Sequence, residues 1–346
     1  MTPEHSSVNQ NSVGSGILEG YSMASIEMDF LQGQLEERKR RLETAVALTP
    51  QNANLAGLLR QVDSALERFA AGTYGLCEKC HGTLERDRLL ADPLVCYCLD
   101  HLTGPQRAAL LHDLDLASQL QRSLLPPADL KVDGWETSYH YAPIGPVSGD
   151  YCDLYPSNGQ LFFVLGDVSG KGVAASMRMT QLHALFRSLI GMGFTLGQVI
   201  AHVNGFLCES ALAGQYATLV CGHAKPTGDG ELFDAGHLPV IVVEHGSVRR
   251  LESTGLPLGM FHQALFASAH LLLDKGDTLF LYTDGLSEAR GENDEYGIDR
   301  LMNLLRRQSS TSTTELISSC LDDLRGFVGA GPGLDDLTLL AIRRSG

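Results

Sequence analysis

The stretch LFFVLGDVSGKG (161–172) runs from an apolar segment into an aspartate and a glycine-rich turn. This pattern is typical of a β-strand that ends in a turn. Strand ends gathered at one edge of a sheet can point several carboxylates at one spot, where they repel each other unless a hard cation lies between them. The same arrangement of an aspartate beside a glycine or an apolar run recurs in VSGDYCD (147–153), LYTDGLSEAR (281–290) and LDDLTLLAI (334–342).

These four segments predict a two-metal site. Its ligands would be Asp150, Asp167, Asp284 and Asp335. Two hard divalent cations held by carboxylates polarise water and hold a phosphoryl group. Asp is also common in turns that bind no metal, so the segments taken one by one are weak evidence.

Composition limits the possible functions. The chain has 346 residues, a net charge of −15 and 44% hydrophobic residues, which is ordinary for a globular protein of two or three domains. The negative charge argues against nonspecific binding to nucleic acid or to anionic membranes. We find neither an apolar stretch near the ~20 residues that span a bilayer nor a signal-peptide pattern. We therefore expect a cytoplasmic protein without a membrane segment.

The chain divides into four parts. Residues 1–20 are polar and are expected to be disordered. Residues 21–104 would form a helical hairpin, with arms near 23–48 and 55–69, followed by a small metal-binding finger. Residues 105–127 would form a linker helix that ends before Pro126. Residues 128–346 would form the domain that contains the four aspartate segments, and the phosphoryl chemistry is therefore assigned to this domain.

The last part alternates short apolar runs with glycine-rich turns. We predict an α+β fold in which strands form layered sheets and the helices group together. Strands are expected at 161–167, 217–224, 238–246, 277–285 and 337–343, and helices at 172–190, 195–212, 298–307 and 313–328.

The linker helix carries an apolar stripe. Leu110, Leu114, Ala117, Gln121 and Leu124 recur at spacings of three or four residues. Such a stripe either docks on a neighbouring domain or pairs with its copy in a dimer. We favour pairing in a homodimer.

Four residues in the finger have the spacing of a zinc site. Cys77 and Cys80 form one pair, and Cys98 and His101 form a second pair with the same gap of two residues. Two such pairs can wrap a tetrahedral Zn²⁺. The alternative is a reduced cluster without metal, and Cys96 could replace one of the ligands or remain a spare thiol.

The segment YGLCEKCHGTLERDRLLADPLVCYCLDH (74–101) resembles the DksA/TraR-type zinc finger, in which a helical hairpin leads into a finger with four ligands. His101 stands where that family usually has a cysteine. The resemblance raises RNA polymerase as a partner. The hairpin arms are short, however, and the tip LTPQNAN (48–54) lacks the acidic residues that such binding uses, so we rank this partner low.

The aspartate segments resemble the SpoIIE/RsbU-type branch of the PPM, or protein phosphatase 2C, family. The resemblance covers about 128–346, together with the SLLPP (123–127) that ends the linker helix. Its order is VSGDYCD, GDVSGKGVAASM, AGHLP (235–239), TGLPLGM (254–260), TDGLSEAR and DDLTLLAIR. This agreement in order argues against two alternatives: that the aspartates are turn residues without a metal, and that the chain has an inactive phosphatase fold. It implies an α-β-β-α sandwich.

The resemblance also implies roles for individual residues. Asp167 would bridge two Mg²⁺ or Mn²⁺ ions, with the backbone carbonyl of Val168 completing one shell. Asp150 would hold the first ion, and Asp284 and Asp335 the second, so that a bridging water attacks phosphorus. Adjacent residues on a strand face opposite sides, so only one of Asp335 and Asp336 should be a ligand. Supporting roles beside the ligands fall to Asp153, Ser169, His237, Glu288 and Asp336.

The substrate implied by the resemblance is phosphoserine on a STAS-domain anti-sigma factor antagonist in a partner-switching pathway. The N-terminal zinc module would then regulate a serine/threonine phosphatase. Two alternatives remain: a regulator that binds the transcription machinery through the finger, and a redox sensor in which thiol oxidation releases zinc.

Overall fold

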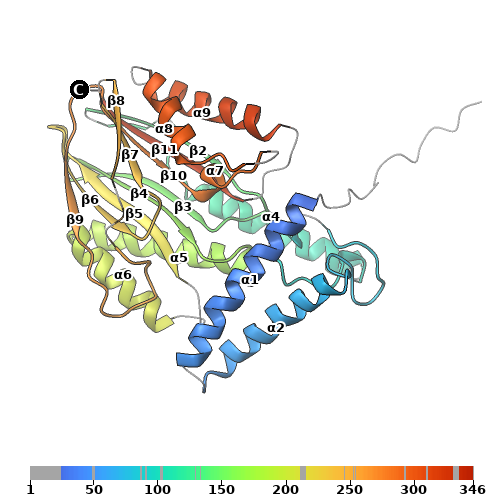
Figure 1. The fold of residues 1–346 in the computed structure, drawn as a ribbon. Coiled ribbons are helices and arrows are strands. Elements are labelled where there is room, and N and C mark those ends of the chain that lie inside the picture. The colour runs from blue at the N-terminus through green and yellow to red at the C-terminus, as the bar shows by residue number, and fades with distance from the viewer. Residues whose placement is uncertain are drawn as a thin grey trace, which may run out of the picture.

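The computed structural model describes residues 25–345, except 49–50, 86–87, 90–91, 102–103, 129, 133, 211–215, 245, 252, 254, 292–293, 309–310 and 330–334. The disorder predicted for 1–20 therefore lies outside the described residues. Two antiparallel sheets lie face to face between two layers of helices (Figure 1). The predicted layered sandwich is confirmed.

The first sheet has six strands. Two of the strands predicted from apolar runs, β10 and β11, lie at its centre; β10 ends and β11 begins at the edge that carries candidate aspartates. The order is β1 (Lys131–Val132), β2 (Trp135–Ala142), β11 (Leu337–Arg344), β10 (Thr278–Tyr282), β7 (Val240–Glu244) and β8 (Ser247–Leu251).

The second sheet has five strands. Along its strand β4, Leu161, Phe163 and Leu165 face the other sheet, whereas Val164 and Val168 face the helices. This alternation follows from the two-residue period of a strand. The order is β3 (Asp150–Ser157), β4 (Gln160–Val168), β5 (Ala217–Ala224), β6 (Asp229–Ala235) and β9 (Ser268–Leu272).

Helices cover both outer faces. The five-stranded sheet is covered by α5 (Val173–Gly191) and α6 (Leu196–Ser210), and the six-stranded sheet by α7 (Asp284–Ser287), α8 (Ile298–Arg307) and α9 (Thr313–Val328). Helix α9 begins at a capping box, in which Ser312 and Glu315 bind each other's backbone amides. The bounds predicted for α8 and α9 are confirmed.

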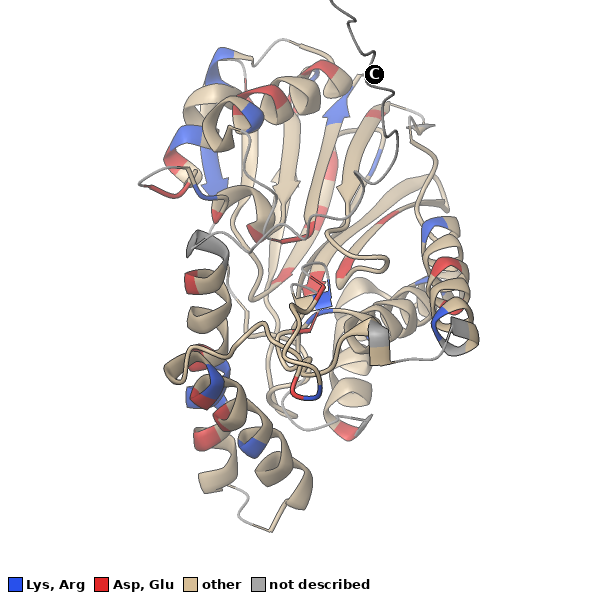
Figure 2. Cartoon of the chain, turned by 90° about the vertical axis from the view of Figure 1, so that its right-hand side faces the viewer, with Lys and Arg blue, Asp and Glu red and all other residues tan. Residues whose placement is uncertain are grey.

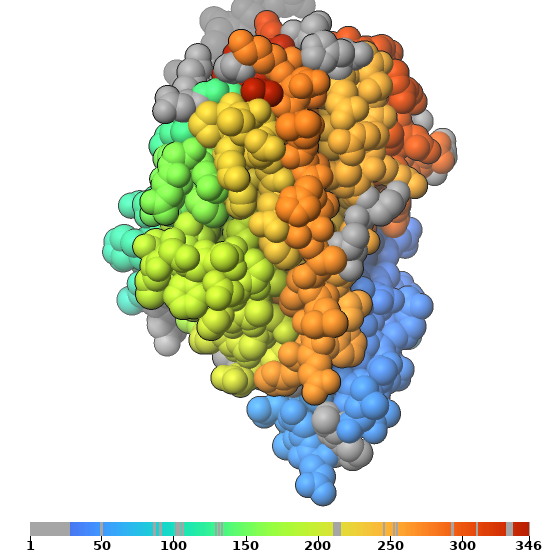
Figure 3. Space-filling model, turned by 90° about the vertical axis from the view of Figure 1, so that its left-hand side faces the viewer, coloured from blue at the N-terminus to red at the C-terminus, as the bar shows by residue number. Residues whose placement is uncertain are grey.

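The N-terminal part forms its own core. Helices α1 (Ser25–Leu48) and α2 (Ala53–Ala70) are antiparallel, and α2 begins at Asn52, whose side chain accepts two backbone N–H bonds. Leu31, Leu35 and Val62 are buried between the helices, together with Cys77 and Cys98 of the finger. The hairpin, in blue, extends beyond the end of the sandwich (Figure 3).

A short 3₁₀ helix (Leu99–His101) and α4 (Gly104–Ser123) connect the finger to the sandwich. The linker helix was predicted to end just before Pro126, but α4 ends at Ser123, and Leu124 and Leu125 bond back to it as turn residues. Acidic and basic residues lie mixed along the helices, and most of the length of the strands carries neither (Figure 2). Among the described residues, no helix is both long and apolar enough to cross a membrane.

Candidate functional site

The candidate aspartates come from both sheets. In the antiparallel pair of β3 and β4, Asp150 lies opposite Asp167. Asp284 follows the end of β10, and Asp335 precedes the start of the neighbouring strand β11. The hydroxyl groups of Thr283 and Thr338 both donate hydrogen bonds to Asp150, which ties the two sheets together at this edge.

Burial and mutual repulsion raise the pKa values of these carboxyl groups. For Asp150 the cause is burial first and Asp336 second; for Asp167 it is burial first and Asp150 second. Burial, Asp335 and Glu288 raise the pKa of Asp284 to about 7. A site that disfavours its own negative charge in this way suits a bound divalent cation.

The carboxylates of the candidate aspartates lie less close together than the ligand atoms of the finger. In the part of the chain that the structure describes, three or more potential ligand atoms within 4.8 Å of one another occur only in the cysteine–histidine group of the finger. The aspartates repel one another without reaching that density. Two hard divalent ions that keep several waters require few direct carboxylate ligands.

Gly149 keeps space open beside the predicted ligands. A Cβ atom at this position would lie 3.0 Å from the carbonyl oxygen of Val168 and 3.3 Å from Oδ1 of Asp167. Both oxygens therefore face the same narrow space, which a larger residue would fill. The predicted use of the Val168 carbonyl is compatible with this geometry.

Asp336 and Asp335 lie in the loop before β11 rather than on a strand, so the expected strand alternation does not apply. Asp336 accepts hydrogen bonds from the N–H groups of Ile144 and Gly149 and from the hydroxyl of Ser148. Through these hydrogen bonds Asp336 holds the 144–149 loop in place. Asp335 instead forms an ion pair with Lys171 at 2.8 Å.

Gln121 was grouped with the dimer-pairing stripe, and this placement is wrong. Its side chain is only 5% exposed. The amide nitrogen donates to the carbonyl of Ser148 at 2.7 Å, and the amide oxygen accepts from the N–H of Ser148 at 2.9 Å. The Ser148 hydroxyl in turn binds Asp336 and accepts from the N–H of Asp150. No local pattern marks this role, because Gln121 and Ser148 meet only in the folded chain.

We expect Gln121→Ala to lower the apparent Mn²⁺ affinity of the site. The change leaves both backbone groups of Ser148 buried without partners, at a cost of about 1–3 kcal/mol, and loosens the loop between Asp336 and Asp150. The measurement is a Mn²⁺ titration of phosphate release combined with thermal unfolding. Gln119→Ala is the matched control. Gln119 is exposed on the same helix, and its side chain donates a hydrogen bond to Asp115 of that helix. Equal titration midpoints for the two variants would contradict the assignment.

The residues given supporting roles lie in different places. Asp153 is buried and forms two 2.7 Å bonds with Arg187, which fastens β3 to α5. Ser169 bonds Tyr216 through both its backbone N–H and its hydroxyl oxygen. Glu288 ends α7 through its backbone N–H, which donates to the carbonyl of Asp284.

His237 joins the two sheets. Its Nδ1 lies 3.0 Å from the Thr218 hydroxyl, and its Nε2 lies 3.2 Å from the carbonyl of Tyr282. Burial lowers the pKa of His237 to about 4, against the opposing effect of the Tyr282 carbonyl. The ring is therefore neutral at pH 7, and it holds strands β5 and β10 beside Asp167 and Asp284.

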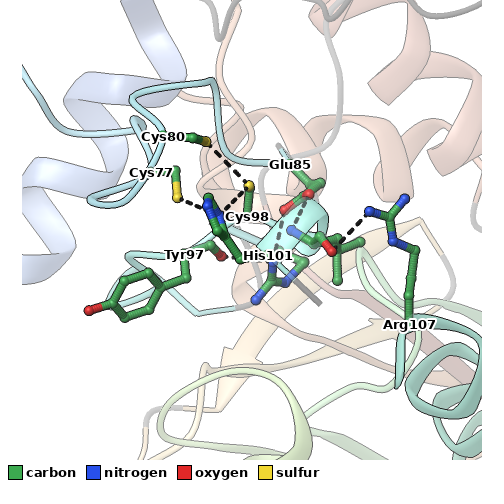
Figure 4. Close-up of polar contacts among 9 residues, drawn as sticks. Cys77, Cys80, Glu85, Tyr97, Cys98, His101 and Arg107 are labelled. Carbon is green, nitrogen blue, oxygen red and sulfur yellow. Dashed lines mark hydrogen bonds and ion pairs between the residues drawn. The ribbon is translucent and has the colours of Figure 1, made fainter. Parts of the chain in front are cut away.

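The predicted zinc ligands gather in the finger (Figure 4). Nδ1 of His101 lies 3.3 Å from Sγ of Cys77 and 3.2 Å from Sγ of Cys98, and the sulfur atoms of Cys80 and Cys98 are 3.7 Å apart. Ligands placed about 2.0–2.3 Å from one tetrahedral zinc ion are about 3.3–3.8 Å from each other. The group therefore has the dimensions that zinc requires.

The surroundings of the four predicted ligands are compatible with a bound cation and fix the loop that carries Cys98. Although burial acts to raise it, the pKa of Cys77 is lowered to about 6 by hydrogen bonds to its sulfur, mainly from backbone amides. Glu85 accepts from the N–H of Leu99, and Arg107 of α4 donates to the Leu99 carbonyl (Figure 4). The finger is thus bonded directly to the linker helix. Cys96 lies outside the group of four.

Comparison with known structures identifies the fold. The SiaA-PP2C domain of Pseudomonas aeruginosa matches with a TM-score of 0.61 at 19% identity, over 70% of this chain and 99% of that domain. The sandwich with carboxylates at one edge is therefore a PP2C-type phosphatase fold. The family model described as stage II sporulation protein E (SpoIIE) matches residues 157–345, more than half of the chain. The chain belongs to the SpoIIE family.

Two curated relatives extend this assignment. Protein IcfG of Synechocystis sp. is 29% identical over 264 residues, which cover 67% of this chain and 42% of IcfG. The phosphoserine phosphatase RsbU of Bacillus subtilis is 25% identical over 237 residues, which cover 67% of this chain and 70% of RsbU. The chain thus spans less than half the length of IcfG and most of the length of RsbU.

Proposed function

We propose that this chain is a metal-dependent phosphatase that hydrolyses phosphoserine on a STAS-domain protein of a partner-switching pathway. The observation that carries the proposal is the convergence of Asp150 and Asp167 from one sheet with Asp284 and Asp335 from the other, in a member of the SpoIIE family. The name of RsbU, a phosphoserine phosphatase, supports the substrate class.

Each residue of the proposed site would have a separate role. Asp167 would hold both Mn²⁺ or Mg²⁺ ions together with the Val168 carbonyl, Asp150 would hold one ion, and Asp284 and Asp335 the other. When bound, the ions supply an activated water and neutralise charge on the phosphoryl group. Thr283 and Thr338 fix the carboxylate of Asp150 through their hydroxyl groups, and Asp336 holds the loop that carries Gly149.

The finger and the linker helix would serve as a regulatory module. The distances among Cys77, Cys80, Cys98 and His101 support one structural Zn²⁺. Helix α4 contacts the loop before Asp150 through Gln121. It also exposes Leu110 of the predicted stripe and three leucines outside that stripe, Leu111, Leu116 and Leu120. This apolar surface supports the proposed pairing of two copies through this helix.

The test is phosphate release from a phosphoserine-bearing STAS-domain protein, with added Mn²⁺ or with EDTA. We expect release by the wild type in Mn²⁺, none in EDTA, and a loss of about 10³-fold or more in Asp167→Asn, because an amide cannot replace the bridging carboxylate. Asp229→Asn is the control. Asp229 is the first residue of β6, at the end of that strand away from Asp167, and it accepts a hydrogen bond from the exposed Thr227. Release that persists in EDTA would overturn the proposal.

A further inference from the structure

Helix α1 lies across the edge of the sandwich where the carboxylates gather (Figure 1). The ammonium of Lys171 lies 5.2 Å from the centre of the Phe30 ring and 2.8 Å from Oδ1 of Asp335. The side chain of Lys171 is only 12% exposed. A residue of the N-terminal hairpin thus covers a cation that touches a proposed metal ligand.

A second contact lies further along the same helix. The guanidinium of Arg41 lies 5.4 Å from the centre of the Tyr216 ring. Tyr216 is bonded in both directions to Ser169, two residues after Asp167. Phe30 and Arg41 are about 16 Å apart along the axis of α1, at 1.5 Å per residue. The helix therefore extends from the Asp335 side of the site to the Asp167 side.

An apolar contact connects the hairpin to the loop that holds the site. Ile144 packs against the core of the hairpin and finger. The N–H of this same residue donates to Asp336 at 2.7 Å. The position of the hairpin is therefore coupled to the 144–149 loop.

The contacts between hairpin and sandwich suit a reversible closure. The hairpin and finger have a core that is separate from the three cores of the sandwich. Besides the apolar contact of Ile144, the side chains of α1 contact the edge through two cation–π pairs, and Arg41 remains 51% exposed. A cation–π pair is weak at an exposed site such as that of Arg41 and stronger at a desolvated one such as that of Lys171. Because the cores are separate, the hairpin can leave without unfolding either part.

We infer that α1 is an autoinhibitory lid, closed in this structure, which must move away before a phosphoprotein reaches Lys171 and Asp335. The inference rests on the proposed phosphatase function of this edge. It assigns to Phe30 and Arg41 the role of holding the lid shut. Neither residue takes part in the chemistry.

The test compares three variants of the full chain. Arg41→Ala should raise the rate of phosphate release from the phosphoprotein about threefold, and Phe30→Ala about tenfold, because each removes a contact that stabilises the closed state. Arg40→Ala is the matched control, since Arg40 is 72% exposed and its recorded ion pair is with Glu37 of the same helix. It should leave the rate unchanged.

Hydrogen exchange gives a reading that does not depend on activity. Amides of residues 169–173 and 216–218 should exchange faster in Arg41→Ala and Phe30→Ala than in the wild type or in Arg40→Ala. Phe30 also belongs to the hairpin core. If Phe30→Ala does not fold, the result for Arg41→Ala alone decides the test.

Unchanged exchange in Arg41→Ala overturns the lid, and so does faster exchange with no gain in the rate of an active wild type. If every protein is inactive with Mn²⁺, the phosphatase proposal fails. In that case the hydrogen-exchange rates alone show whether α1 covers this edge.

Discussion

Gly285→Ala is expected to remove most of the proposed phosphatase activity and to destabilise the sandwich. A Cβ atom at this position would lie 2.1 Å from the carbonyl oxygen of Asp336 and 2.9 Å from its carbonyl carbon. Both are backbone atoms, so no side-chain rotation can relieve the clash. The turn that carries Asp284 must therefore move away from the loop that carries Asp335.

The expected size follows from this displacement. A shift of about 1 Å between groups that act together can cost about 100-fold in rate, and forced backbone movement in a packed region costs about 1–3 kcal/mol. The measurements are Mn²⁺-dependent phosphate release and thermal unfolding. Gly326→Ala is the control, because Gly326 lies in helix α9 with open space around it, and alanine there should be neutral or stabilising. Activity of Gly285→Ala near that of the wild type would show that the two aspartates need not be held together.

Cys77→Ser is expected to abolish zinc binding and to unfold the finger. Cys77 is fully buried between the hairpin helices and the rest of the finger. Structural zinc in small fingers contributes about 10–16 kcal/mol of apparent folding free energy. A small finger that loses its metal therefore has little else to keep it folded.

Cys96→Ser is the matched control for this prediction. Cys96 lies two residues before Cys98 but outside the group of four. The measurement is zinc content per chain after dialysis, together with the helix signal in circular dichroism. We expect one zinc ion in the wild type and in Cys96→Ser, and almost none in Cys77→Ser. Loss of zinc from Cys96→Ser instead would mean that Cys96 is a ligand.

Local patterns predicted the elements with strong periodicity and the groups with fixed spacing. Helices α8 and α9 and strands β4 and β11 have continuous apolar patterns, so their positions were predicted closely. The pairs around Cys77 and Cys98 are also local. Strands β2 and β3 were missed, because WETSYHYA and DYCDLYPS carry polar residues or proline in place of an apolar run.

The polar residues of β3 are tolerated only because distant partners satisfy them. Asp153 is buried against Arg187, and Asp150 is held by Thr283 and Thr338. Such partners lie far apart in the chain, and no periodic pattern records them. The role of Gln121 and the position of α1 over Lys171 have the same origin.

Local sequence patterns predicted which residues are available for metal and phosphoryl chemistry, because aspartates beside glycine turns and cysteine pairs are local features. Which carboxylate holds a loop and which pairs with Lys171 follows only from the fold. The position of the hairpin at the edge where the candidate aspartates lie also follows only from the fold. Both depend on packing between segments far apart in the chain, where the side chain that fits is selected by its surroundings and not by its neighbours in sequence.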